Sequence, residues 1–158
     1  MSDTLPVPPF NGGYLRQVTD APFEGWWEWF PEDPFEGLAG PFRVCRDAQG
    51  RILCGFMPTH KNLNGHGMVH GGSLMTFADF ALFMIAAEDG EVVHGVTVTM
   101  NSEFVSGAPA DVPLHARGEI VRKGGGLIFV RGMITSEGTN VLAFSGAIKR
   151  VKTKFVSH

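Results

Sequence analysis

The chain has 158 residues, of which 44% are hydrophobic and 18% charged, with a formal net charge of −3. This length and composition fit one globular domain with a substantial core. The small negative charge gives no general attraction to nucleic acid or to anionic membranes. No apolar run has the length that spans a membrane, and the N-terminus is acidic and proline-rich, unlike a signal peptide. We therefore expect a cytoplasmic protein without nucleic-acid or membrane partners.

The charges are unevenly distributed along the chain. Residues 1–40 contain seven acids and one base, whereas residues 117–158 contain eight bases and two acids. This asymmetry predicts an acidic leading segment and a basic patch near the C-terminal end of the fold.

Residues 1–40 are predicted to form an N-terminal extension, and residues 41–158 the main domain. Six of the ten prolines fall in the extension, which argues against a long helix but leaves room for a short one over residues 24–30. The extension also carries an aromatic cluster, made of Phe23, Trp26, Trp27, Trp29, Phe30 and Phe35. Three tryptophans are too much apolar surface to leave in water. We expect the extension to pack on the main domain, with a lid over a pocket or a subunit contact as the alternatives.

Residues 42–57 are typical of a β-hairpin closed by a polar turn at Asp47–Gly50. Pairing centred on this turn would place Cys45 opposite Cys54, so that a disulfide is conceivable. Two cysteines in a chain without a signal peptide are better interpreted as reduced, buried thiols. They also lack the spaced histidines of a structural zinc site, so no metal is expected.

An apolar helix is predicted over residues 71–87, and Asp79 is its only charged side chain. A helix that is apolar on nearly all sides is normally buried. A carboxylate there costs several kcal/mol of desolvation unless it is compensated. We expect Asp79 to be functional; the alternative is a structural acid satisfied by backbone or hydroxyl groups. Apolar residues at helical spacing around it are expected to be core, namely Met75, Phe77, Phe80, Phe83 and Met84.

Four strands are predicted after this helix, at residues 92–104, 112–122, 127–136 and 141–151, each bounded by glycine, proline or asparagine. A single apolar helix that precedes four antiparallel strands is buried only if the sheet curls around it. The predicted fold class is therefore α+β.

The segment before the helix, Asn64–Gly72, is rich in glycine. Glycines at a helix start let a ligand approach the free backbone N–H groups, which suit an oxyanion forming on an acyl carbonyl. A phosphate-binding loop is less well supported, because the segment matches neither GxGxxG nor GxxxxGK[ST].

The segment fits the pattern NxxGxxHGGxxxxxxD, with its defined positions at Asn64, Gly67, His70, Gly71, Gly72 and Asp79. This pattern resembles that of the hotdog-fold acyl-CoA thioesterases. The likeness is greatest to the phenylacetate-pathway (PaaI-like) branch of the 4-hydroxybenzoyl-CoA thioesterase superfamily, and it covers about residues 41–152. The resemblance implies an antiparallel sheet curled around one long central helix. It also implies hydrolysis of an acyl thioester to free acid and thiol, with no cofactor other than the coenzyme A of the substrate.

The resemblance assigns roles to five residues. Asp79 matches the general base or nucleophile, and the Gly71 N–H matches the donor that polarises the thioester carbonyl. Asn64 matches a residue that orients water or the acyl group, and Thr97 a hydroxyl that holds the attacking water. His70 matches the motif histidine, which is more often orienting than catalytic. The structural alternatives are a loop or cap amide for Asn64, a hydrogen-bonded histidine for His70, and an ordinary strand threonine for Thr97.

Spacing along the helix predicts how the site is assembled. Eight residues separate Gly71 from Asp79, which is roughly 12 Å at 1.5 Å per residue. This is too far for both to reach one carbonyl, and the helix N-terminus of a partner subunit would resolve the distance. The resemblance implies that Asp79 and Thr97 of one subunit face Asn64, His70 and Gly71 of its partner. The site then requires a homodimer with two equivalent sites, and the resemblance suggests a dimer of dimers.

Several further residues are candidates for contact with the substrate. Coenzyme A is predicted to contact Gly72, Arg122 and Lys123. Additional candidates for contact with its phosphates are Arg150 and Lys152. The alternative is that these basic residues are ordinary strand ends exposed to solvent. The apolar helix residues would line an acyl pocket in addition to the core. Four histidines receive no role and are expected at the surface: His60, His66, His94 and His115.

Two other functions are compatible with the pattern. One is a hotdog hydratase or dehydratase. The sites of those enzymes resemble a His paired with an Asp or Glu in a different motif, and the HGG-x-Asp spacing of this sequence argues against it. The other is a non-catalytic acyl-CoA-binding protein. The sequence does not determine which acyl group the protein prefers, or whether the acyl group is carried by coenzyme A or by acyl carrier protein.

Overall fold

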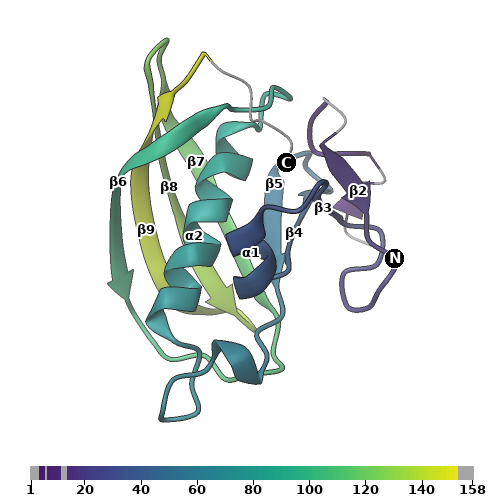
Figure 1. The fold of residues 1–158 in the computed structure, drawn as a ribbon, viewed down its shortest axis with the longest axis vertical. Coiled ribbons are helices and arrows are strands. Elements are labelled where there is room, and N and C mark those ends of the chain that lie inside the picture. Colours follow the sequence, from purple (N-terminus) through teal and green to yellow (C-terminus); the bar gives the residue numbers. More distant parts are fainter. Residues whose placement is uncertain (1–3, 6, 12–13, 153–158) are drawn as a thin grey trace.

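The computed structural model describes residues 4–5, 7–11 and 14–152. Within these residues it contains one long helix lying across the concave side of a curved antiparallel sheet (Figure 1). The predicted α+β architecture, a sheet curled around a central helix, is confirmed.

The elements follow one another in the order strands, short helix, hairpin, long helix and four-stranded meander. Their bounds are β1 Thr4–Leu5, β2 Leu15–Gln17, β3 Trp27–Trp29, α1 Pro34–Ala39, β4 Phe42–Asp47, β5 Ile52–Phe56, η1 His60–Asn62, α2 Gly71–Ala86, β6 Gly95–Phe104, β7 Leu114–Lys123, β8 Leu127–Ser136 and β9 Thr139–Arg150. The sheet order is β2-β3-β4-β5-β7-β8-β9-β6, with β1 paired to β4. Strand β6, although first in the meander, therefore lies at the edge of the sheet.

Helix α2 is bound closely to the concave face of the sheet. A Cβ atom added to Gly118 would lie 2.7 Å from Cδ1 of Ile85, and one added to Gly146 would lie 2.7 Å from Cδ1 of Leu82. Glycine at these two strand positions therefore lets the helix approach the sheet backbone. Phe77, Phe80 and Met84 are buried as predicted, whereas Phe83 is half-buried and Met75 is exposed.

The hairpin β4–β5 forms as predicted, but its register differs by one residue. Cys54 pairs with Val44, and Cys45 with Leu53, so the two cysteines are not opposite each other. Because side chains alternate between the faces of a sheet, Cys45 joins a small outer cluster with Phe23 and Trp26, and Cys54 joins the main core. Both thiols are free and buried, as expected.

The N-terminal extension continues the sheet instead of lying outside it. Strand β3 pairs with β4 through Trp27 and Val44, and β2 pairs with β3. The short helix for which residues 24–30 left room does not form, because aromatic residues favour strands and β4 offers an edge to pair with. The helix forms later, where Asp33 caps it and Pro34 takes its first position.

His115 is not the surface histidine that we expected. Its ring lies 6.3 Å from that of Phe23 and 6.0 Å from that of Trp26. Burial lowers the pKa of His115, and the positive charge of Arg117 lowers it further. The extension thus covers this part of β7. Within the described residues, no helix is long and apolar enough to cross a membrane.

Candidate functional site

The Asp79 carboxylate is held by a hydroxyl from the edge strand. Oγ1 of Thr97 donates a hydrogen bond of 2.6 Å to Oδ1 of Asp79. Thr97 points to the concave side because it pairs with the buried Ile148. The strand then bulges between Thr97 and Thr99. The contact brings together two predicted site residues that are 18 positions apart in the chain.

Asp79 is less isolated than its sequence context indicated. It lies on the more open side of α2, near the exposed Met75 and the half-buried Thr76, and is itself half-buried. It takes part in none of the ion pairs found among the described residues. The Asp79 carboxyl group therefore has no cation partner among the described residues, but it is oriented by Thr97 and partly solvated.

The start of α2 is organised by His70, which is the N-cap residue of the helix. Its Nδ1 accepts a hydrogen bond of 2.8 Å from the Gly72 N–H, and its carbonyl oxygen accepts bonds from Ser73 and Leu74. Because Nδ1 is an acceptor here, the ring proton is assigned to Nε2. His70 thus adopts the structural role that was one of its two interpretations.

The Gly71 N–H is a backbone donor that the His70 cap leaves without a hydrogen bond. It has no acceptor within the described residues, as expected for the first position of a helix. A Cβ atom on Gly71 would lie 2.9 Å from Cε1 of Phe104, so glycine also lets the end of β6 approach the helix. The open N–H at the positive end of α2 is suited to an oxyanion.

Asn64 shapes the loop that leads into the helix. Its Oδ1 accepts hydrogen bonds from the His66 N–H at 2.9 Å and the Met68 N–H at 3.2 Å. These bonds correspond to the loop-amide alternative, and they leave the Asn64 NH₂ group as the part that can contact a ligand.

Two of the predicted site residues are not brought together within one chain. Gly71 and Asp79 belong to the same uninterrupted helix, so about 12 Å of helix separates them. A single copy therefore presents the Asp79 carboxyl group and its Thr97 hydroxyl partner at one point of α2, and the open Gly71 N–H at another.

The predicted coenzyme A contacts fall at two different places. Gly72 lies in the first turn of α2, where its N–H is already bonded to His70. Lys123 lies at the other end, where it donates to the Ala86 carbonyl oxygen at 3.0 Å and pairs with Asp89. Burial raises the pKa of Asp89, but the hydrogen bond and charge of Lys123 outweigh it and hold that pKa below its usual range. Arg122 is exposed and is in no ion pair of the described residues.

Asn62 was not predicted from the sequence, yet it connects the elements around the site. It is only 3% exposed. Its Nδ2 donates to the Ala39 carbonyl oxygen of α1 at 2.7 Å and to Ser73 Oγ at 3.4 Å, and its own carbonyl oxygen accepts from the His70 N–H. Asn62 also bonds locally to Thr59, but the partners through which it connects elements lie 8 to 23 residues away. An asparagine in a polar loop therefore carries no distinctive signal of this role in sequence.

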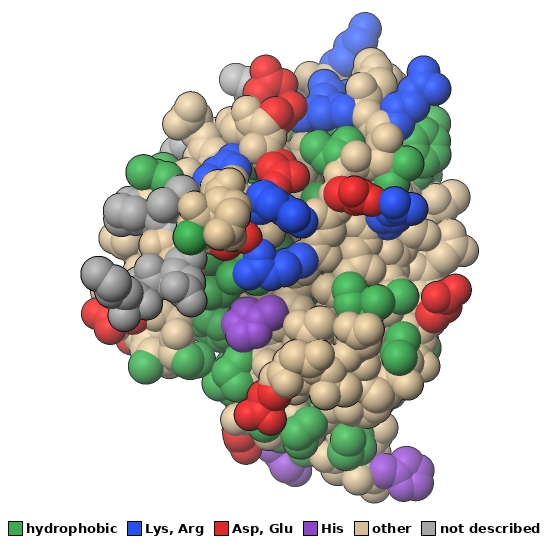
Figure 2. Space-filling model, turned by 180° about the vertical axis from the view of Figure 1, so that it is seen from behind, with side chains coloured by type: hydrophobic (Ala, Val, Ile, Leu, Met, Phe, Trp, Pro, Cys, Tyr) green, Lys and Arg blue, Asp and Glu red, His purple; other side chains and the backbone are tan. Residues whose placement is uncertain are grey.

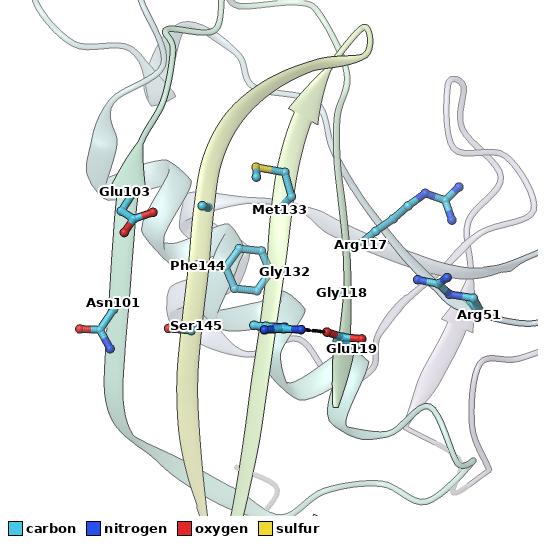
Figure 3. Close-up of a pocket in the computed structure, with 12 residues that line it drawn as sticks. Arg51, Asn101, Glu103, Arg117, Gly118, Glu119, Gly132, Met133, Phe144 and Ser145 are labelled. Atoms are coloured by element: carbon cyan, nitrogen blue, oxygen red, sulfur yellow. Dashed lines mark hydrogen bonds and ion pairs between the residues drawn. The ribbon is translucent and has the colours of Figure 1, made fainter. Parts of the chain in front are cut away.

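The outer face of the sheet carries a cavity of about 510 Å³ that contains none of the predicted site residues (Figure 3). Arg131 pairs with Glu119 within it, and Arg117 pairs with Asp47. Figure 2 shows that basic and acidic side chains both occur on this face. The cavity lies on the side of the sheet opposite to Asp79 and α2, so we do not assign the chemistry to it.

Comparison with known proteins finds similarity to thioesterases. The sequence model of the thioesterase superfamily matches residues 66–143, which include His70, Asp79 and Thr97. Human acyl-coenzyme A thioesterase 13 is 25% identical over 114 residues, or 71% of this chain and 80% of that protein.

Solved structures show the same fold. A point mutant of the phenylacetic acid degradation protein PaaI from Thermus thermophilus superposes with a TM-score of 0.64 and 26% identity, covering 75% of this chain and all of that one. A hypothetical thioesterase protein from Streptococcus pneumoniae, solved with coenzyme A, gives 0.61 at 24% identity, covering 70% and 88%.

The matched segment and the solved structures make this chain similar to the hotdog-fold thioesterases. The similarity includes PaaI, as the HGG-to-Asp pattern predicted.

Proposed function

We propose that the protein hydrolyses an acyl-CoA thioester to a free acid and coenzyme A, with Asp79 as the reacting carboxylate. The observation that carries this proposal is the 2.6 Å hydrogen bond from Thr97 to Asp79 on a helix whose first N–H is open. The similarity to an acyl-coenzyme A thioesterase supports the substrate class.

The chemistry needs a base, an oxyanion donor and a leaving thiolate. As a general base, Asp79 removes a proton from water while the water oxygen attacks the thioester carbonyl carbon. The negative charge that develops on the carbonyl oxygen is stabilised by a Gly71 N–H, and the C–S bond then breaks to release the thiolate. As a nucleophile, Asp79 would form a mixed anhydride that water hydrolyses. In both routes Thr97 orients the carboxylate.

The oxyanion donor in this scheme comes from a second copy of the chain. Strand β6 is a long edge strand with exposed apolar side chains, among them Val96, Val98 and Phe104. An edge of this kind is normally covered by another strand. Pairing of two copies through β6 gives a two-fold dimer. In this dimer Asp79 and Thr97 of each subunit would meet the Gly71, His70 and Asn64 of the other. A dimer of dimers is also part of the proposal.

Coenzyme A is proposed to bind between the glycine-rich helix start and the basic strand end. Arg122 is the better candidate for a phosphate contact, because its guanidinium is exposed. Lys123 would have to share its ammonium with Asp89 and the Ala86 carbonyl. No further cofactor takes part in this scheme.

The proposal is tested by measuring free thiol released from a panel of short, medium and aryl acyl-CoAs. Asp79→Asn and Asp79→Ala are expected to lower kcat by about 10²-fold or more, because each removes the base. Folding is expected to survive, since an unpaired charge is removed from a partly buried site.

The matched control is Glu91→Gln, which removes an exposed carboxylate soon after α2 and should leave kcat unchanged. Wild-type protein that releases no thiol from any member of the panel would exclude the proposed function. Loss of enoyl absorbance from crotonyl-CoA without thiol release would identify a hydratase instead.

A further inference from the structure

Helix α1 turns an acidic side chain inwards and its apolar side chains outwards. Phe35 is 65% exposed and Leu38 is 75% exposed, whereas Glu36 between them is half-buried. A surface helix normally directs its apolar side chains towards the core. Burial of apolar area therefore does not explain why α1 docks with Glu36 on its inner side.

Hydrogen bonds at both ends of α1 hold it in this orientation. Asp33 Oδ1 accepts from the Phe35 N–H at 3.1 Å and from the Glu36 N–H at 3.2 Å, which caps the start of the helix. The buried Asn62 side chain donates to the Ala39 carbonyl oxygen at 2.7 Å, which fixes the end. The position of Glu36 is thus built into the fold.

Glu36 lines a cavity of about 260 Å³ between α1, the main domain and the N-terminal extension. Helix α1 lies beside α2 and next to β4 at this place (Figure 1). Three elements contribute aromatic rings to the cavity: Trp29 from β3, Phe42 from β4 and Phe80 from α2. The rings of Phe42 and Phe80 are 5.4 Å apart, and both are buried. Ligand pockets for drug-sized molecules measure about 300–1,000 Å³, so this cavity suits a smaller organic molecule.

The charged side chains that line the cavity leave it short of cations. They are Arg16, Arg43, Glu28, Glu32, Asp33 and Glu36. Both arginines pair with Glu28, and the other three acids are in no ion pair of the described residues. Of these three, Glu32 and Asp33 are exposed to water and Glu36 is half-buried.

The Glu36 carboxyl group is the unsatisfied polar group of this cavity. Among the described residues its side chain takes part in no hydrogen bond, since only its backbone N–H and carbonyl oxygen are bonded. Burying a carboxyl group without a partner is unfavourable. A ligand that offers a positive charge or a donor would remove this cost.

We propose that the cavity binds a small organic ammonium ion, whose charged group pairs with Glu36 and whose apolar body packs on Phe42 and Phe80. An ammonium group supplies the cation that the carboxyl groups lack, and aromatic faces also attract a cation. An anion would meet the same carboxyl groups with both arginines already engaged. The site lies apart from the proposed thioesterase chemistry, because Phe80 is the one lining residue within the matched residues 66–143.

The test on the wild-type protein compares three probes of similar shape: benzylamine, an ammonium ion at pH 7, benzyl alcohol, which is neutral, and benzoate, an anion. Binding is followed by NMR through the backbone amide signals of Phe42 and Phe80 and the indole signal of Trp29. We expect benzylamine to bind about tenfold more tightly than either of the others, or better. Equal affinity for benzylamine and benzyl alcohol, preference for benzoate, or no shift of these signals at millimolar benzylamine would overturn the proposal.

Two variants test the role of Glu36 in this binding. Glu36→Gln keeps the shape of the side chain and removes its charge, so it should weaken benzylamine binding by about tenfold and leave benzyl alcohol binding within about twofold. The matched control is Glu24→Gln, which removes an exposed carboxylate of the extension outside the cavity and should bind benzylamine as the wild type does. Unchanged benzylamine affinity in Glu36→Gln would contradict the proposal.

Proton release on binding gives an independent measurement. Burial raises the pKa of the Glu36 carboxyl group to about 8, and the negative charge of Asp33 adds to the rise. The group is therefore mostly protonated at pH 7, and a bound ammonium favours its ionised form. Calorimetry at pH 7 in two buffers of different ionisation enthalpy should show that the wild type releases about one proton per benzylamine bound. Binding without proton release would place the ammonium group away from Glu36 and overturn the proposal.

Discussion

At the scale of single residues, the site depends on a hydroxyl and a carboxylate from different elements. The hydrogen bond from Thr97 to Asp79 compensates part of the desolvation that the helix imposes on the carboxylate. Hydrogen bonds to charged groups contribute about 1.5–3 kcal/mol. The bond also fixes the direction in which the second carboxylate oxygen is presented, which matters for proton transfer.

Thr97→Val tests this contact, because valine keeps the shape of threonine without its hydroxyl. We expect kcat to fall about tenfold with little change in KM, since the carboxylate loses its orientation while the pocket keeps its volume. The control is Thr99→Val, an exposed position on the other side of the bulge. Steady-state kinetics on the preferred acyl-CoA measure both. Equal kcat values for Thr97→Val and the wild type would remove Thr97 from the mechanism.

At the scale of elements, the start of α2 leaves one backbone donor open. His70 caps Gly72, Asn64 shapes the loop, and Asn62 ties the first turn to α1. These bonds satisfy the neighbouring polar groups and leave the Gly71 N–H open. The rigid first turn thus presents one donor in a fixed direction, which is what stabilisation of an oxyanion requires.

Gly71→Pro removes this single donor. Proline is tolerated at the first position of a helix, and the extended backbone of His70, with φ −63° and ψ 137°, suits a residue that precedes proline. We expect kcat to fall by about 10²-fold, the typical loss when one oxyanion donor is removed.

The matched control is Gly71→Ala, which introduces a Cβ against Phe104 but keeps the N–H. It should retain much more activity than Gly71→Pro, because the oxyanion donor is kept. If both variants lost activity equally, the cause would be crowding and not the missing donor.

At the scale of the whole molecule, each active site is proposed to combine two subunits. Helix length separates Asp79 from the Gly71 of its own chain, and the β6 edge is available for a second copy. Two inactive variants with defects in different halves of the site should therefore restore each other.

We predict that mixing Asp79→Asn with Gly71→Pro, after dissociation and reassociation, recovers activity. Half of the dimers in an equal mixture are mixed, and each of these has one intact site out of two, so the expected recovery is about a quarter of wild-type activity. Thiol release from the mixture, compared with each variant alone, gives the result. No recovery in a sample that contains mixed dimers would place the whole site within one chain.

Local features of the sequence determined the elements and the motif. The helix begins at Gly71 and strand β8 covers Leu127–Ser136, both as predicted. The hairpin also forms where the Asp47–Gly50 turn indicated. Apolar periodicity, turn residues and the HGG-to-Asp spacing are carried within short stretches of chain, so they can be read without the fold.

Only the tertiary structure decided how these stretches meet. The strand at Trp27–Trp29 depends on a pairing partner outside its own segment. The register of the β4–β5 hairpin, which separates Cys45 from Cys54 by one residue, became known only from the observed pairing. Contacts between distant residues also include Thr97 on Asp79 and Lys123 on the end of α2. They join residues 18 to 37 positions apart, and their energies arise from packing and desolvation in the folded chain. The sequence determined that Asp79 is a carboxylate in an apolar helix, and the fold decided which groups surround it.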